Sequence, residues 1–140
     1  MAVRISNAAA LVGLDAITAL INVNGPGEMR IFIGAPPTNC SDADPANLLA
    51  SHLFSADAFP DATDAAPGAT AVANAIGDDI SADMAGAPGC FRVYDGNGLC
   101  ILQGTAGFTG DGTDCDFDKS PFAIGDLVKI TAMTLNLAES

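Results

Sequence analysis

The chain has 140 residues, a formal net charge of −12 and 49% hydrophobic residues. These totals predict one globular domain, residues 1–140, with a single core. They argue against binding to nucleic-acid phosphates and against docking on an anionic membrane. No apolar run reaches the ~18 consecutive residues of a membrane span. The acidic charge is explained most simply as a means of keeping the protein in solution.

The first predicted element is an α-helix over about residues 6–22. Ser6 is suited to cap it, and Asn24-Gly25-Pro26-Gly27 is suited to end it. One stripe of the helix is apolar, at the positions Ala10, Leu14, Ile17 and Ile21. Asp15 interrupts the apolar run, so we interpret the segment as part of the mature fold and not as a signal peptide.

Two strands are predicted next. Residues 28–34 alternate in polarity, but Phe32 stands on the polar side, which suggests that this strand is covered on both faces. A rigid turn follows, and Asp44-Pro45 either starts a short helical turn or lies in plain loop. Residues 48–54 predict the second strand, in which His52 is expected to be structural or at the surface.

The middle of the chain has weaker signals. Residues 57–68 are rich in Ala, Asp and Pro and predict a long loop that is free to move. Residues 70–76 predict a weak strand. Residues 79–85 are expected to pair loosely at a sheet edge.

A hairpin is predicted over residues 91–104, around the turn Asp95-Gly96-Asn97-Gly98. With an even loop, the core face would hold Phe91, Val93, Cys100 and Leu102. The opposite face would hold Arg92, Tyr94, Leu99 and Ile101. Because Arg and Tyr are enriched where protein surfaces meet, this second face is a candidate subunit interface. The alternative is that the N-terminal helix covers it within one subunit.

The last predicted strand covers residues 127–137. Its apolar face switches sides near Thr131-Ala132, which a β-bulge or a bend would produce. One helix followed by several short strands predicts a mainly β fold, a small antiparallel β-sandwich or barrel-like domain with the helix packed beside it.

Residues that could carry chemistry are few. Asp114, Asp116 and Asp118 would share one face of a strand and are weak candidates for a metal site, because hard cations favour clustered carboxylates. They lack the spacing of an EF-hand, and a solvated acidic loop is the simpler interpretation.

The four cysteines have no C-x-x-C spacing and the chain has one histidine, which argues against zinc. Cys90 and Cys100 are expected to pack as small apolar side chains. A Cys40–Cys115 bridge between two loops is an alternative in an oxidising setting. The sequence contains no nucleophile elbow, catalytic triad or phosphate-binding loop, so we predict a protein that is not an enzyme and has no cofactor.

Several segments together resemble small virion proteins of tailed bacteriophages. They are "MAVRIS" with "DAITALI", "GPGEMRIFIGAPP", "NLLASHLFS", and "FRVYDGNG" with "LQGTAG" after it. The resemblance implies a capsid decoration (cement) protein, often a homotrimer, that binds the major capsid protein on the outer surface of a virion assembled in the host cytoplasm. It brings no catalytic residues with it.

Two other functions remain open at this stage. A tail or neck component, such as a tube, terminator or fibre-associated subunit, would suit an acidic chain equally well. A calcium-dependent module that binds glycans on a host surface would use the acidic segment before the last strand.

Overall fold

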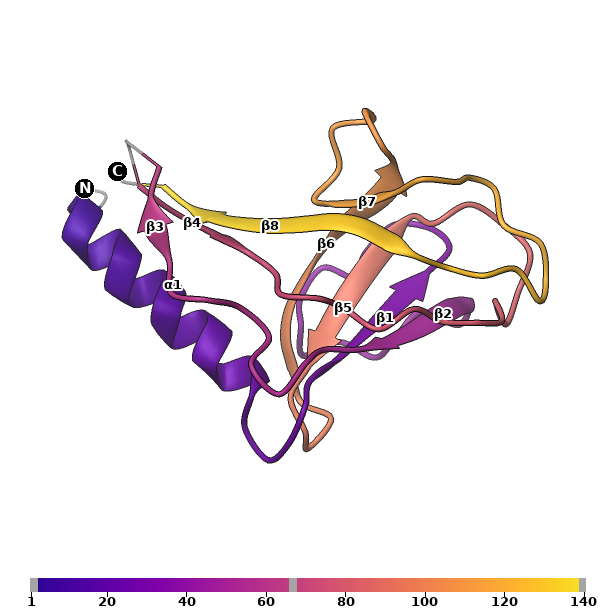
Figure 1. The fold of residues 1–140 in the computed structure, drawn as a ribbon, viewed down its shortest axis with the longest axis horizontal. Helices are drawn as coiled ribbons and strands as arrows, with labels where there is room; N and C mark the ends of the chain where they lie inside the picture. Colours follow the sequence, from indigo (N-terminus) through magenta and orange to yellow (C-terminus); the bar gives the residue numbers. More distant parts are fainter. Residues whose placement is uncertain (1–2, 66–67, 139–140) are drawn as a thin grey trace.

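The computed structural model describes residues 3–65 and 68–138. In this part of the chain the fold is mainly β, with one helix near the N-terminus, as the sequence predicts (Figure 1). The elements are α1 (Asn7–Ile21), β1 (Glu28–Phe32), β2 (Leu48–Leu53), β3 (Thr63–Asp64), β4 (Ala69–Val72), β5 (Cys90–Tyr94), β6 (Cys100–Phe108), β7 (Cys115–Phe117) and β8 (Ile130–Leu137).

These strands form one sheet in the order β2-β1-β5-β6-β7-β8-β4-β3. All neighbouring pairs are antiparallel except β6 and β7, which run parallel. β8 is therefore a long strand that pairs with β7 on one side and β4 on the other, and it joins the part of the sheet from β2 to β7 to the short strands β3 and β4 beside the helix (Figure 1).

An irregular segment, residues 76–86, closes one end of this sheet. On one side the amide of Asp83 donates to the carbonyl oxygen of Leu49 in β2, at 2.8 Å. On the other side Asp79 and Val128, which precedes β8, exchange both backbone hydrogen bonds, at 3.0 and 2.7 Å. Because the segment joins the free edge of β2 to the chain that leads into β8, the sheet curls into a barrel-like body. The edge of β2 is also protected from pairing with other chains.

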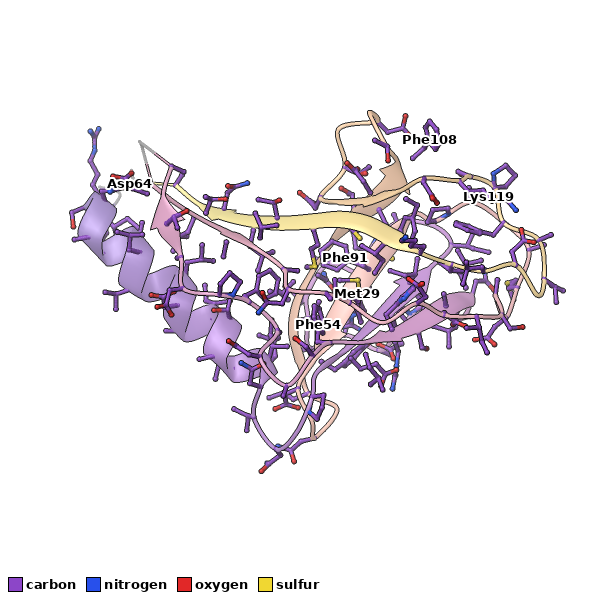
Figure 2. All side chains as sticks on the ribbon, viewed as in Figure 1. Met29, Phe54, Asp64, Phe91, Phe108 and Lys119 are labelled. Atoms are coloured by element: carbon purple, nitrogen blue, oxygen red, sulfur yellow. The ribbon has the colours of Figure 1, made fainter. Side chains whose placement is uncertain are left out.

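The core lies between the helix and the inner face of the curled sheet. Met29, Phe54 and Phe91 point into this interior in Figure 2 and are buried. α1 contacts β3, β4, β6 and β8, and it contributes Ala10, Leu14 and Ile21 to the core.

Helix α1 begins as predicted, with the Ser6 hydroxyl accepting from the amide of Ala9 at 3.2 Å. Its buried stripe differs at one position, where Thr18 is buried and Ile17 is half-buried. The Thr18 hydroxyl donates to the carbonyl oxygen of Asp15 within the helix, at 3.1 Å, and this satisfies the donor away from water.

The described residues of the segment 57–68 are tied to the helix and its C-cap by three polar side chains. Asn7 accepts from the amide of Gly68 at 2.9 Å, Asp15 from Ala62 at 2.7 Å, and Asn22 from Ala58 at 3.0 Å. Asn7 and Asp15 of α1 and its C-cap residue Asn22 are spaced by eight and seven, so they lie on one face. The segment also includes β3, which the sequence did not predict.

Two irregularities in strand pairing decide which side chains share a face. In the last strand the register shifts between the pairs Phe117–Ile130 and Asp116–Ala132, which confirms the predicted bulge at this point. In the hairpin, Val93 pairs with Leu102 and Tyr94 with Cys100, so Ile101 is an extra residue. The predicted placement of Cys100 on the core face was wrong, because the bulge moves it to the face of Tyr94.

Candidate functional site

The second face of β1, β5 and β6, opposite the core, is covered by the chain's own loop. This covering loop, residues 33–47, connects β1 to β2 and folds back over the sheet. With the core on one face and this loop on the other, every residue of β5 is buried. The sequence had offered the N-terminal helix or a neighbouring subunit as the cover. The helix packs elsewhere, and the covering loop takes this position.

Asp44 is the centre of the polar contacts beneath the loop. Its carboxylate accepts from Arg92 Nη1 at 2.5 Å, from Arg30 Nη1 at 3.1 Å and from the Tyr94 hydroxyl. Arg30 also pairs with Glu28, at 2.9 Å, and its guanidinium lies 4.6 Å from the centre of the Tyr94 ring. We call Arg30, Asp44, Arg92 and Tyr94 the Asp44 cluster.

Backbone oxygens of the covering loop complete the contacts. Arg92 Nη2 donates to the carbonyl oxygen of Cys40 at 2.5 Å, and Nη1 donates to that of Asp42 at 3.0 Å. Gln103, which pairs with Arg92 across the hairpin, donates to the carbonyl oxygen of Pro37 at 2.5 Å. The face therefore binds the loop at several points along its length, and a buried arginine finds partners for its charge.

The cluster shifts the titration of Tyr94 strongly. Burial raises the pKa of Tyr94, and its hydrogen bond to Asp44 and the negative charge of Asp44 raise it further. Arg92 and Arg30 act in the opposite direction without cancelling these effects. The phenol therefore stays protonated and remains a hydrogen-bond donor to Asp44 throughout the neutral range.

An open cavity of about 340 Å³ lies at the rim of the covering loop. The Asp44 cluster lines it together with Cys40 of the loop and with Leu99 and Cys100 of the hairpin. The cavity is lined by both acidic and basic side chains, and its arginines are already paired with Asp44. These contacts hold the covering loop against the sheet.

The four residues predicted as an interface are divided by the structure. Arg92 and Tyr94 are 1% and 4% exposed, both beneath the covering loop. Ile101, at the bulge, is half-buried and packs against the core. Leu99 is 65% exposed beside the turn. Within one chain, Leu99 is the member of this set that a neighbouring subunit could contact; the interface itself stays a prediction.

The three acidic candidates lie around β7. The Asp114 carboxylate accepts from the amide and the hydroxyl of Thr105, at 3.0 and 2.9 Å, and Asp116 accepts from the Thr113 hydroxyl at 3.1 Å. Asp118 is exposed. Among the described residues no group of three or more His, Cys, Asp or Glu side chains is arranged to hold a metal ion.

The structure separates Cys40 from Cys115 and gives His52 a buried, structural position, which is one of the two that were expected. Cys115 is fully buried in β7, whereas Cys40 shares a cavity with Cys100, so the structure does not support a Cys40–Cys115 bridge. His52 is buried, and its Nδ1 lies 2.8 Å from the carbonyl oxygen of Gly77. Cys90 is buried, as predicted.

Sequence reasoning did not identify Asp44, the centre of the cluster. Its partners Arg92 and Tyr94 lie 48 and 50 residues further along the chain, and nothing local pairs them. The available signal was indirect. The chain has five basic residues, and two of them, Arg30 and Arg92, lie in predicted strands, where each would need an acidic partner such as Asp44.

Comparisons with known proteins add no relatives to this picture: no family model matches the chain, and neither a search of curated proteins nor one of solved structures finds a match. Among the described residues, no helix has both the length and the apolar character needed to cross a membrane.

Proposed function

We propose that the chain is a non-enzymatic structural protein of a tailed-bacteriophage virion. In this proposal it is a capsid decoration protein that binds the major capsid protein on the outer shell and associates as a homotrimer. The resemblance of its segments to small virion proteins supports this assignment. A closed β body whose polar cluster serves to hold its own loop is consistent with a stabilising role.

The observation that carries the proposal is an exposed apolar patch where the closing segment, residues 76–86, pairs with the chain that leads into β8. The patch consists of Ile80 and Leu127, which are 82% and 54% exposed. Ile80 and Leu127 flank the hydrogen-bonded pair Asp79–Val128, so the two side chains lie on adjacent segments. Large aliphatic side chains exposed side by side in this way are typical of a protein contact.

A decoration protein gains from such a patch even when each contact is weak. Several copies bound to one shell, or three joined in a trimer, multiply the effect of a single contact. The net charge of −12 makes a separate contribution. It repels other particles and free DNA electrostatically, so that they do not adhere to the decorated surface.

The test is attachment of purified protein to capsids that lack it, measured by co-sedimentation. We expect Ile80→Glu to reduce attachment at least tenfold while leaving the melting temperature unchanged, because this side chain makes little contact within its own subunit. The matched control is Val12→Glu, on the exposed face of α1, where the side chain is 70% exposed. Loss of attachment in both variants, or in neither, would remove the patch from the proposal.

A tail or neck location is the second candidate, and it rests on the same acidic charge. Cryo-electron microscopy of the virion distinguishes the two. Decoration predicts density for this fold on the outer shell near local threefold or quasi-threefold positions. Density confined to the tail or neck would contradict it.

A further inference from the structure

Two cysteines meet at the edge of the covering loop. Cys40 lies in the loop and Cys100 begins β6, and both line the cavity beside the Asp44 cluster. Two residues of β5 place them there, one through its side chain and one through strand pairing. Arg92 binds the carbonyl oxygen of Cys40 at 2.5 Å, and Tyr94 pairs with Cys100 across the hairpin.

The bulge at Ile101 places Cys100 on the same side of the sheet as Cys40. With regular pairing, Cys100 would share a face with Val93 and point toward the core. The extra residue turns it to the face that carries Arg92 and Tyr94, beneath the rim of the covering loop.

The surroundings of the pair differ from those of the other two cysteines. Cys40 and Cys100 are partly exposed, and the Cys40 thiol is close enough to Cys100 to affect the pKa of Cys100. Burial raises the pKa of Cys100 to about 11, the Cys40 thiol contributes to this rise, and Arg92 opposes it. Cys90 and Cys115 are fully buried, and burial raises the pKa of Cys115 to about 12, so both are shielded from oxidants.

We propose that Cys40 and Cys100 are a modification site that forms an intrachain disulfide and locks the covering loop over Arg92 and Tyr94. The thiols are free in the structure, which represents the reduced state of this site. The oxidant is a small disulfide of the glutathione class.

The reaction is two successive thiol–disulfide exchanges. The Cys40 thiolate attacks one sulfur of oxidised glutathione, forms a mixed disulfide and displaces one glutathione thiolate. The Cys100 thiolate then attacks the Cys40 sulfur of the mixed disulfide and displaces the second glutathione thiolate. The two protons released by the protein thiols are taken up by the two glutathione thiolates. One protein disulfide and two reduced glutathione molecules result.

The consequence is a covalent tie between the covering loop and β6. The bond closes a loop of about 60 residues, and cross-links of that span restrict the unfolded chain strongly. We expect the melting temperature of the oxidised protein to rise on the order of 10 °C. If the proposed virion role holds, the site would be reduced during assembly in the cytoplasm and oxidised after release; the disulfide itself requires no capsid.

The experiment equilibrates the isolated protein in glutathione buffers of increasing oxidised fraction and then blocks the remaining thiols. Cleavage before aspartate residues places the four cysteines in four different peptides, so mass spectrometry assigns any bridge directly. We expect one Cys40–Cys100 bridge in a monomeric chain, with Cys90 and Cys115 blocked only after denaturation.

The variants separate this bridge from nonspecific oxidation. Cys40→Ser and Cys100→Ser should each abolish both the bridge and the rise in melting temperature, whereas Cys90→Ala should keep both. Should Cys90→Ala fail to fold, the peptide map of the wild-type protein decides alone. Four free thiols at every glutathione ratio, a bridge between other cysteines, or a bridge only between two chains would overturn the proposal, whatever the protein does on a virion.

Discussion

Asp44 accepts hydrogen bonds from two arginines and a tyrosine, and two of these three, Arg92 and Tyr94, come from a strand distant in sequence. The mixed polarity of the hairpin predicted that Arg92 and Tyr94 would be covered. The sequence did not show that the covering loop would lie over them. The loop binds Arg92 largely through backbone oxygens, and backbone contacts of this kind leave no pattern in the side chains of the sequence. The loop that buries Arg92 also supplies the oxygens that its charge needs once it is removed from water.

The titration of Tyr94 tests this cluster at the level of one residue. The chain has one tyrosine and no tryptophan, so the phenolate absorbance reports Tyr94 alone. The folded-state pKa is raised above the unfolded value of about 10. Its contribution to stability is therefore complete below pH ~10 and is lost as pH rises further.

As the pH is raised, we expect the phenolate absorbance to appear at the same pH at which the protein unfolds. Circular dichroism on the same samples measures the unfolding. Asp44→Asn should lower the pH at which both signals change. A phenol that ionises near pH 10 in a protein that remains folded would contradict the geometry of the cluster.

His52 provides a second prediction at this scale, in which folding lowers the pKa of the side chain instead of raising it. Burial lowers its pKa, and its contact with the Gly77 carbonyl and the charges of Asp79 and Asp78 only partly oppose this. The unfolded chain therefore takes up the proton first as the pH falls. Stability is fully present above pH ~6.5 and decreases as the pH falls from there through the folded-state pKa.

The single imidazole gives one well-resolved proton signal in NMR spectra, which measures this pKa directly. We expect a midpoint below 6.5 in the folded protein. In His52→Gln the loss of stability between pH 7 and pH 5.5 should be smaller than in the wild-type protein. A midpoint at or above 6.5 would show that the ring is not buried as described.

At the scale of elements, the helix and most strands follow from local signals, and the long connections do not. The Ser6 cap and the apolar stripe predict α1, and alternation predicts β1, β5 and β8. The segment 57–68 looked like a free loop because its own residues have little periodicity. The described part of this segment is held instead by α1 and its C-cap, where three polar side chains accept hydrogen bonds from its amides. Such a contact is a property of two elements together and is not visible in either one.

Asp15 tests this docking of the loop on the helix. Asp15→Ala removes the acceptor for the amide of Ala62, and losing such a bond costs about 1 kcal/mol. Because alanine is the better helix former, part of that loss is regained within α1. Hydrogen exchange at the Ala62 amide is therefore the sharper measurement.

We expect this amide to exchange faster in Asp15→Ala than in the wild-type protein, and to remain protected in Asp15→Asn, which keeps an acceptor oxygen. Asp83→Ala, which removes an exposed carboxylate with the same change of charge, should leave it unaffected. Equal exchange in all four proteins would mean that Asp15 does not hold the segment.

At the scale of the whole molecule, the sheet is closed by a segment that belongs to no regular strand. The sequence predicted a mainly β fold with a helix beside it, and also that residues 79–85 would pair at an edge; the structure confirms the fold, and it shows Asp79 paired with Val128. The closure leaves Ile80 and Leu127 outward, where the proposed contact with a capsid lies. Surface side chains of this kind follow no period, so a sequence cannot reveal that they gather.

The measurement that tests the proposed function most directly is the number of copies of this chain in each purified virion, obtained by quantitative mass spectrometry against the major capsid protein. A decoration protein covers the shell, so we predict a copy number of the same order as that of the major capsid protein. A copy number that is a small fraction of it, as for a ring in the neck or tail, or absence from the particle, would contradict the proposal.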